Sequence, residues 1–304
     1  MPFVPAIPPQ PVTVFGGFDY VTVDAVRRRV YAAHTGSRAL LVVDADTGKV
    51  VGQVRVGPMH GVAVDPQTGH VFTGNGTDNT ISEVDPVALK VVRSVDVDGP
   101  VDAMAYDPAN HHLYADEDDG TKVWVVDTQT FKLAKTITIP GHKPEYLAVD
   151  PKTHAVYQNI DDLHEIAVID GNALTVTRTI PNPELQHNHP LQFDPGLNLI
   201  VVGGSNGVMS TYAPDGTKRG QLDSAGRYDQ CDLDPTQHVI ACGGEGGVTR
   251  ISVAKDGKLA VLDKTQINPG VHTDAIDPKT HAVFAVWANR DGSGDFVQKF
   301  TPAP

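Results

Sequence analysis

The sequence predicts an all-β fold, a seven-bladed β-propeller built from four-stranded antiparallel blades. The first observation is a repeated Asp-Pro pair, and the second is the regular spacing of these pairs. Seven aspartates, called the repeat aspartates below, follow one another at intervals of 41, 42, 43, 44, 40 and 43 residues: Asp24, Asp65, Asp107, Asp150, Asp194, Asp234 and Asp277. Proline follows each of them except Asp24, which precedes Ala25. A period of about 40 to 45 residues, filled with short strands and turns, is typical of propeller blades.

The composition favours one closed ring over two separate domains. The chain has 304 residues, and its 29 glycines and 23 prolines suit many tight turns between short strands. We expect a single domain over residues 1–304, with a Pro-rich N-terminal lead at 1–11. The net charge of −13 disfavours nucleic acid and membrane surfaces as partners. The partner we expect is a small-molecule substrate, and the sequence leaves the oligomeric state open.

Taken in chain order, the first expected element is an isolated strand at 12–15. A full repeat unit then holds four strands, for example at 61–64, 70–73, 80–84 and 91–97, each with alternating apolar positions. The final unit ends near 296–300 and lacks an outermost strand. We expect the N-terminal strand to complete this last blade, which closes the ring and leaves no open sheet edge.

The repeat aspartates lie in the turn that joins the first two strands of each unit. An aspartate there accepts hydrogen bonds from backbone N–H groups, so we interpret these residues as structural and not catalytic. The two cysteines, Cys231 and Cys242, face each other across the same hairpin of the sixth unit. Both a disulfide and a reduced buried pair fit that position.

Two strand segments carry a resemblance to a known family. Residues 166–170 read Ile-Ala-Val-Ile-Asp, and residues 123–130 read Val-Trp-Val-Val-Asp-Thr-Gln-Thr. In these segments and in its Asp-Pro turns the chain resembles the YVTN-repeat β-propeller family, and the fifth and sixth units depart from the pattern at 211–213 and 251–253. The resemblance implies a propeller fold and a periplasmic or secreted location. The N-terminus itself lacks the basic and apolar segments of a signal peptide.

The 13 histidines divide between the two faces of the predicted ring. Six lie four or five residues after a repeat aspartate, in or beside the hairpin on the bottom face, and we interpret them as turn residues: His70, His111, His112, His154, His238 and His281. The other seven map to the top-face loops or to the start of an innermost strand: His34, His60, His142, His164, His187, His189 and His272.

A metal-ligand type of residue stands five positions before every repeat aspartate. These seven, called the mouth ring below, are Asp19, His60, Asp102, Glu145, His189, Asp229 and His272. Because each begins an innermost strand, we expect them to surround one end of the central channel. The three histidines of the mouth ring come from blades two, five and seven, which divides the ring as evenly as seven blades allow. This arrangement predicts a divalent metal held by His60, His189 and His272. Zinc is the first expectation, and copper or iron come next.

The remaining candidate residues lie on the same face. Glu145, Asp229 or Asp102 is expected to act as a further ligand or general base, and His34 pairs with Asp19 across the first hairpin, so a carboxylate can fix its tautomer. His187 and His189 form a His-x-His pair on one face of a strand. Candidates for substrate binding are His187, His142, Arg227, Tyr228, Trp287 and Asp19. The alternative interpretation of the charged loop residues among them is that they are exposed to solvent and bind no substrate.

Other chemistries lack their motifs. The acidic stretch 116–120 does not have the spacing of an EF-hand loop, the glycines at 243–247 are not followed by Lys-Ser/Thr, and no Gly-x-Ser-x-Gly sequence is present. The first functional hypothesis is a metal-dependent hydrolase or lyase. The alternatives are an oxidoreductase that uses copper or iron at the same site, and a propeller that binds a ligand or protein without catalysis.

Overall fold

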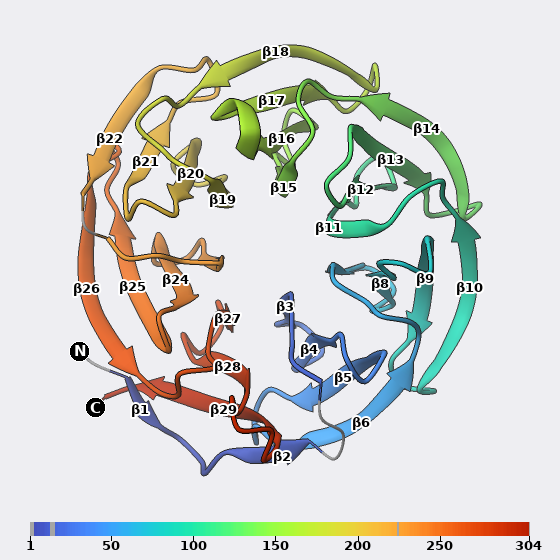
Figure 1. The fold of residues 1–304 in the computed structure, drawn as a ribbon, viewed down its shortest axis with the longest axis vertical. Helices are drawn as coiled ribbons and strands as arrows, with labels where there is room; N and C mark the ends of the chain where they lie inside the picture. The colour runs from blue at the N-terminus through green and yellow to red at the C-terminus, as the bar shows by residue number, and fades with distance from the viewer. Residues whose placement is uncertain (1–2, 13–15, 224, 304) are drawn as a thin grey trace.

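The structure, a computed structural model, describes residues 3–12, 16–223 and 225–303. It is all-β: seven antiparallel sheets stand around a central channel, and every sheet is one blade (Figure 1). The only helix in the described residues is one 3₁₀ turn, Asp161–Leu163. The sequence-based prediction of a seven-bladed β-propeller is therefore confirmed.

Each of the first six blades is formed by four consecutive strands, from the channel outward. Blade one contains β3 (Val21–Asp24), β4 (Arg29–His34), β5 (Ala39–Asp44) and β6 (Val50–Arg55), and blade two β7 (Val62–Val64), β8 (Val71–Gly74), β9 (Thr80–Asp85) and β10 (Lys90–Asp96). Blade three contains β11 (Val101–Asp107), β12 (His112–Glu117), β13 (Lys122–Asp127) and β14 (Lys132–Thr138), and blade four β15 (Pro144–Val149), β16 (Ala155–Ile160), β17 (Glu165–Asp170) and β18 (Thr175–Pro181). Blade five contains β19 (Asn188–Asp194), β20 (Leu199–Gly204), β21 (Met209–Tyr212) and β22 (Lys218–Leu222), and blade six β23 (Gln230–Asp234), β24 (Val239–Gly244), β25 (Gly247–Val253) and β26 (Leu259–Gln266).

The seventh blade joins the two ends of the chain. Its inner strands are β27 (Thr273–Ile276), β28 (Val283–Ala288) and β29 (Asp295–Pro302), and two N-terminal strands, β1 (Phe3–Pro5) and β2 (Gln10–Val12), both pair with the outer edge of β29. Phe3 pairs with Pro302, so β1 and the end of β29 lie side by side (Figure 1). The predicted closure of the ring by the N-terminal segment is confirmed. The segments that pair with β29 lie mostly inside the Pro-rich lead. Of the expected strand at 12–15, only Val12 lies within the described residues.

The repeat aspartates build the same turn in every blade. One carboxylate oxygen of each accepts the backbone N–H of the residue two positions later, for example Val26 for Asp24 and Lys279 for Asp277. The residue four positions after each aspartate has a positive φ, and histidine, asparagine and glycine are among the types that tolerate this conformation. The predicted structural role of these aspartates is confirmed.

Several of the same aspartates also bind the next blade. The Nδ1 atoms of His154, His238 and His281 lie 2.6 to 2.7 Å from the repeat aspartate of the preceding blade. Arg28 closes the ring in the same way, with its guanidinium 2.7 Å from Asp277. These bottom-face histidines are thus more than turn residues, because they connect adjacent blades.

The hydrophobic core is divided into seven clusters, one at each interface between adjacent blades. The cluster between blades seven and one, for instance, packs Leu41 and Val30 against Phe284. This arrangement follows from the alternating strand pattern, since each sheet is apolar on both faces and must be covered by a neighbour on each side. Within the described residues, no helix is long and apolar enough to cross a membrane.

Candidate functional site at the mouth of the channel

The mouth ring forms as predicted, one residue from each innermost strand. All seven members lie within two residues of the start of β3, β7, β11, β15, β19, β23 or β27, and these strands contact one another around the channel. In blades three, four and five the pairing shifts register at the ring position, for example between Val101 and Met104. Such a β-bulge bends the strand and redirects a side chain, which explains how Asp102, Glu145 and His189 turn toward the channel mouth.

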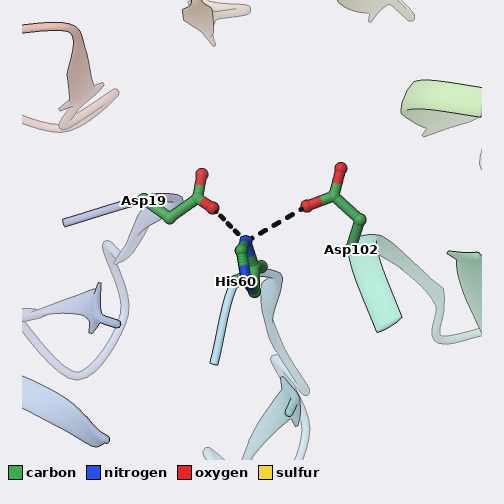
Figure 2. A group of neighbouring side chains, drawn as sticks. All are labelled: Asp19, His60 and Asp102. Carbon is green, nitrogen blue, oxygen red and sulfur yellow. Dashed lines mark hydrogen bonds and ion pairs between the residues drawn. The ribbon is translucent and has the colours of Figure 1, made fainter. Parts of the chain in front are cut away.

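Asp19, His60 and Asp102 form the closest group in the ring. His60 Nδ1 lies 2.6 Å from Asp19 Oδ2 and 3.6 Å from Asp102 Oδ1, so the imidazole stands between two carboxylates from the adjacent blades (Figure 2). One ligand atom from each residue lies within 4.8 Å of the other two. Gln230 supports the group by donating from Nε2 to Asp19 Oδ1 at 2.7 Å.

Acidic side chains are concentrated around this group. Burial, followed by the charges of Asp19 and Asp116, raises the pKa of Asp102 well above its ordinary value. Asp116 on β12 is fully buried, and burial likewise raises its pKa. Asp116 Oδ1 accepts the backbone N–H of Ala103 at 2.7 Å, so it also holds the bulge that carries Asp102. Crowded carboxylates of this kind are stabilised by a cation.

The hydrogen bond with Asp19 has the largest effect on the His60 imidazole. It raises the pKa of His60 to about 9 against the opposing effect of burial, and the charges of Asp19 and Asp102 add to the rise. A histidine must lose its proton to bind a metal. A cation at this site therefore has to displace a proton from His60.

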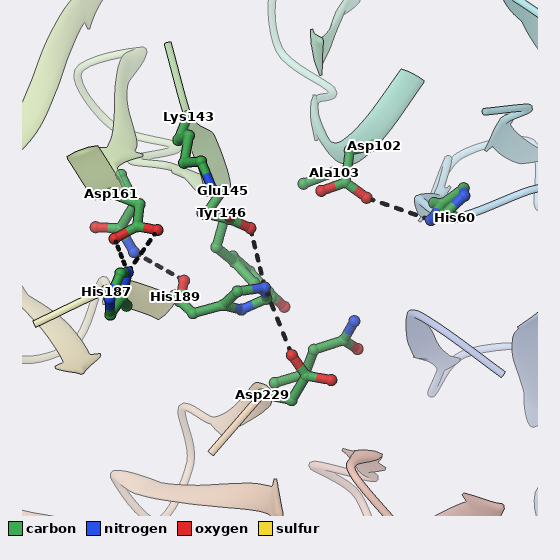
Figure 3. Close-up of polar contacts among 12 residues, drawn as sticks. His60, Asp102, Ala103, Lys143, Glu145, Tyr146, Asp161, His187, His189 and Asp229 are labelled. Atoms are coloured by element: carbon green, nitrogen blue, oxygen red, sulfur yellow. Dashed lines mark hydrogen bonds and ion pairs between the residues drawn. The ribbon is translucent and has the colours of Figure 1, made fainter. Parts of the chain in front are cut away.

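A second group occupies the opposite side of the mouth. His189 Nε2 lies 3.0 Å from Glu145 Oε2 and 3.5 Å from Asp229 Oδ1 (Figure 3). Asp229 Oδ2 also lies 2.7 Å from His272 Nδ1. Burial lowers the pKa of His189, but the hydrogen bond to Glu145 and the two carboxylate charges raise it overall to about 10. Burial acts to raise the pKa of Asp229, yet the two histidines hold it below its ordinary value. This side is an imidazolium–carboxylate network.

The three histidines predicted to share one metal do not meet. Among residues 3–12, 16–223 and 225–303, only one group of at least three His, Cys, Asp or Glu side chains brings its ligand atoms within 4.8 Å of one another. That group is Asp19, His60 and Asp102. His60, His189 and His272 each pair instead with a carboxylate from an adjacent blade. The repeat period predicted the positions of the three histidines around the ring. Each imidazole, however, contacts a carboxylate of an adjacent blade and not the other two histidines.

His34 also has a different partner from the one predicted. The backbone brings Asp19 next to Ala33, the residue before His34, since Asp19 N–H donates to Ala33 O at 2.9 Å. The side chain of His34, however, is fully buried, stacks on Phe18 and bonds through Nε2 to Asp295 of the last blade. This contact joins blades one and seven, and the catalytic role of His34 stays a prediction.

The predicted substrate-binding residues are dispersed. His187 precedes β19 with a φ of 48°, is 72% exposed and pairs with Asp161, so it does not share a face with His189 (Figure 3). Two others, His142 and Arg227, are exposed. Tyr228 and Trp287 are buried, and their polar atoms donate to Ala225 O and Asn289 Oδ1. Of the predicted substrate-binding residues, Asp19 is a member of the closest group.

Sequence reasoning missed several residues near the mouth. Asp116 and Gln230 support the first group, and Tyr20 and Tyr146 directly follow ring members Asp19 and Glu145. Further inside, Asp232 and Gln192 stand two positions before a repeat aspartate, where four of the other five units carry alanine. Comparing the repeats position by position shows these exceptions.

Comparisons with known proteins identify the fold and nothing finer. No protein-family model matches the chain, and no curated protein matches it. Among solved structures it is similar to hydrazine synthase from Kuenenia stuttgartiensis, with a TM-score of 0.78 and 15% sequence identity over 94% of this chain and 96% of that chain. At this identity the similarity shows a shared propeller fold only.

The two cysteines are linked in the structure. Cys231 on β23 and Cys242 on β24 are directly opposite in register and form a disulfide. The bond lies beside Gln230, which supports Asp19. It therefore ties the two strands together close to the mouth ring.

Proposed function

We propose that the protein is a divalent-metal-dependent enzyme whose metal is held by Asp19, His60 and Asp102 at the channel mouth. The observation that carries the proposal is the convergence of these three ligand atoms within 4.8 Å, in a region of crowded acids. Three protein ligands with an open position are the arrangement of catalytic metal sites. The imidazole suits Zn²⁺ and Fe²⁺, and the two carboxylates suit Mn²⁺.

The residues on the other side of the mouth supply acid–base chemistry. When bound, a divalent metal polarises a substrate oxygen or lowers the pKa of water. His189, with a pKa of about 10, carries a proton at neutral pH and donates it to a leaving group. Glu145 keeps the imidazole of His189 oriented, because its Oε2 lies 3.0 Å from His189 Nε2. Hydrolysis or elimination is the reaction type that this pairing favours, and bound iron would favour redox chemistry instead.

Metal analysis of protein purified without added metal tests the site. We expect about one Zn²⁺, Mn²⁺ or Fe²⁺ per chain, and a loss of affinity of more than about tenfold in Asp102→Asn and Asp19→Asn. His187→Gln, on the same face but outside the group, is the matched control and should bind normally. Undiminished binding in Asp102→Asn, or no metal in the unaltered protein, contradicts the proposal.

His272→Gln separates this site from a three-histidine centre. It removes one member of the triad expected from the sequence but leaves Asp19, His60 and Asp102 in place, so metal binding should persist. Catalysis is tested by hydrolysis of activated esters and phosphoesters with and without EDTA. An enzyme should lose turnover in His189→Gln while it keeps the metal; a metal-binding propeller without catalysis would show no turnover in any form.

We further infer that the chain is related to the YVTN-repeat propellers and acts in a periplasmic or secreted setting. The strand sequences at 123–130 and 166–170 and the Cys231–Cys242 disulfide support this, since such bonds persist in oxidising compartments. Blocking free thiols at the moment of cell lysis and then counting them tests it. Two free thiols per chain would argue for a reducing compartment.

A further inference from the structure

A cavity of about 260 Å³ lies in the central channel, next to the mouth ring. The innermost strands of blades one to six line it. At one level of the channel, blades two, three and four carry only the small side chains of Ala63, Ala105 and Ala148. At the same level, blades five and six carry Gln192 and Asp232. The cavity thus has a small apolar wall facing a polar one.

Tyr20 offers an unused polar group to this cavity. The residue is 6% exposed, lines the cavity, and its hydroxyl has no hydrogen-bond partner among the described residues. A buried hydroxyl without a partner is costly and calls for a ligand or water. Tyr20 directly follows Asp19, so this hydroxyl belongs to the residue next to the proposed metal ligand.

The polar wall presents acceptors to the cavity. The Gln192 amide nitrogen donates to Cys231 O at 2.6 Å and to the Tyr146 hydroxyl at 3.0 Å, which leaves its carbonyl oxygen free to accept. The Tyr146 hydroxyl in turn donates to Cys231 O at 3.3 Å. The donors on this wall are therefore engaged with the protein itself.

Asp232 adds a carboxylate that has no salt bridge within the described residues. Its two oxygens accept the backbone N–H groups of Leu233 and Ile276, and no lysine, arginine or histidine is among the residues that line the cavity. Burial raises the pKa of Asp232 to about 7. Nearby Asp274 is also buried, and burial together with the charge of Asp232 raises its pKa well above the ordinary value.

We propose that this cavity binds the primary ammonium group of a small alkylamine, with Asp232, the Gln192 carbonyl and the Tyr20 hydroxyl as acceptors. Three acceptors match the three N–H donors of an alkylammonium. The rings of Tyr20 and Tyr146, with centroids 5.3 Å apart, offer aromatic faces that attract a cation. The volume of about 260 Å³ lies just below the usual range of ligand pockets, which favours a small ligand.

The amine site and the metal site are separate claims. Binding of the amine needs only the cavity residues, whereas its role as the substrate class rests on the proposed metal-dependent function. An amine held beside Tyr20 and Tyr146 would place its substituent near Asp19 and Glu145, which precede these tyrosines in the chain. The enzyme would then act on a bond of a small amine.

Calorimetric titration of EDTA-treated protein tests amine binding without the metal. The probes are ethylammonium and n-propylammonium, with n-propanol as the neutral isostere and KCl as the inorganic cation. We expect saturable binding of the ammonium probes, no heat from n-propanol, and affinity lower by about tenfold in Asp232→Asn and about fivefold in Tyr20→Phe. Tyr157→Phe, a buried tyrosine outside the cavity, should bind like the unaltered protein.

Each result decides one claim. Absence of ammonium binding, equal binding of n-propanol, displacement of the probes by KCl at the same concentration, or unchanged affinity in Asp232→Asn overturns the amine proposal. Thermal melting of every variant confirms that it is folded before its affinity is used, and Tyr20→Phe serves if Asp232→Asn does not fold. Amine binding in a protein that takes up no metal would leave this inference standing and sink the proposed function alone.

Discussion

The role of a histidine in this propeller depends on the carboxylate nearest to it. His60 lies between two acids at the channel mouth, His238 bonds a repeat aspartate of the preceding blade, and His34 is buried against Asp295. The residue type is the same in all three places. Its solvent exposure and its partner decide whether it can bind a ligand or only stabilise the ring.

Glu184 provides a test of how buried polar contacts contribute to stability. Burial acts to raise the pKa of Glu184, but hydrogen bonds from Tyr212, Ser210 and Lys218 lower it to about 2. A carboxyl whose folded pKa is depressed stabilises the fold above its unfolded pKa and loses that contribution as the pH falls. Glu184→Gln should therefore reduce the free energy of unfolding by about 2 kcal/mol at pH 7.

The pH dependence is the decisive part of this prediction. The difference between the unaltered protein and Glu184→Gln should shrink by about 1 kcal/mol between pH 7 and pH 3.5, because the unfolded glutamate takes up its proton in that interval. Urea denaturation at the two pH values measures it. A difference that stays constant with pH would show that the variant loses packing and not a charge-dependent contact.

The sequence could place the mouth-ring residues but could not choose their partners. Counting five positions back from each repeat aspartate located Asp19, His60 and Asp102 correctly at one end of the channel. It could not show which side chains come within 4.8 Å, because that depends on bulges and on rotamers fixed by packing. The same limit explains why His34 was matched with Asp19 while its ring bonds Asp295.

The connections between blades show how a short repeat is turned into a closed ring. A repeat aspartate shapes its own turn with one carboxylate oxygen and binds the next blade with the other, as Asp194 does with Gly196 and His238. The turn was readable from the sequence, because it involves residues two positions apart. The contact to His238 was not, because it joins residues 44 positions apart in the chain.

His238→Ala should weaken the ring without affecting the mouth. We expect a loss of about 1 kcal/mol, the value of one hydrogen bond that is partly exposed to solvent. His111→Ala is the matched control, since His111 occupies the same turn position with a similar positive φ but bonds no repeat aspartate of the preceding blade. The backbone cost of alanine cancels in the comparison. Equal destabilisation of both variants, measured by urea denaturation, would rule out a contribution from the contact.

At the scale of the whole molecule, stability depends on the seam in blade seven. The N-terminal strands β1 and β2 cover the edge of β29, and Phe3 packs into the cluster between blades six and seven beneath the guanidinium of Arg250. All other blades are continuous in sequence. The ring therefore closes through strands that are almost the whole chain length apart.

Phe3→Ala should open this seam. We expect a loss of about 3 kcal/mol in the free energy of unfolding, as for other buried phenylalanines. Val4→Ala, the neighbouring residue on β1 with 39% exposure, should change it by less than about 0.5 kcal/mol. Thermal and urea unfolding measure both. If Phe3→Ala is as stable as Val4→Ala, the closure by β1 adds nothing to the fold.

The architecture was predictable to within a residue or two. The spacing of the repeat aspartates gave seven blades, and the strands expected at 80–84 and 91–97 correspond to β9 and β10. The expected closing strand at 12–15 lies outside the described residues except for Val12, which ends β2. The sequence did not indicate β1 or the start of β2, because each is a short segment that contains proline and its only signal is the missing partner of β29. The channel cavity escaped prediction, since a cavity depends on which small and large side chains face one another across the ring.

The proposed metal at Asp19, His60 and Asp102 is tested most directly by anomalous diffraction from crystals grown with Mn²⁺ or Zn²⁺. The proposal predicts one strong peak within about 2.0 to 2.2 Å of a ligand atom of each of the three residues. No peak at the mouth, or a peak shared by His60, His189 and His272, would contradict it.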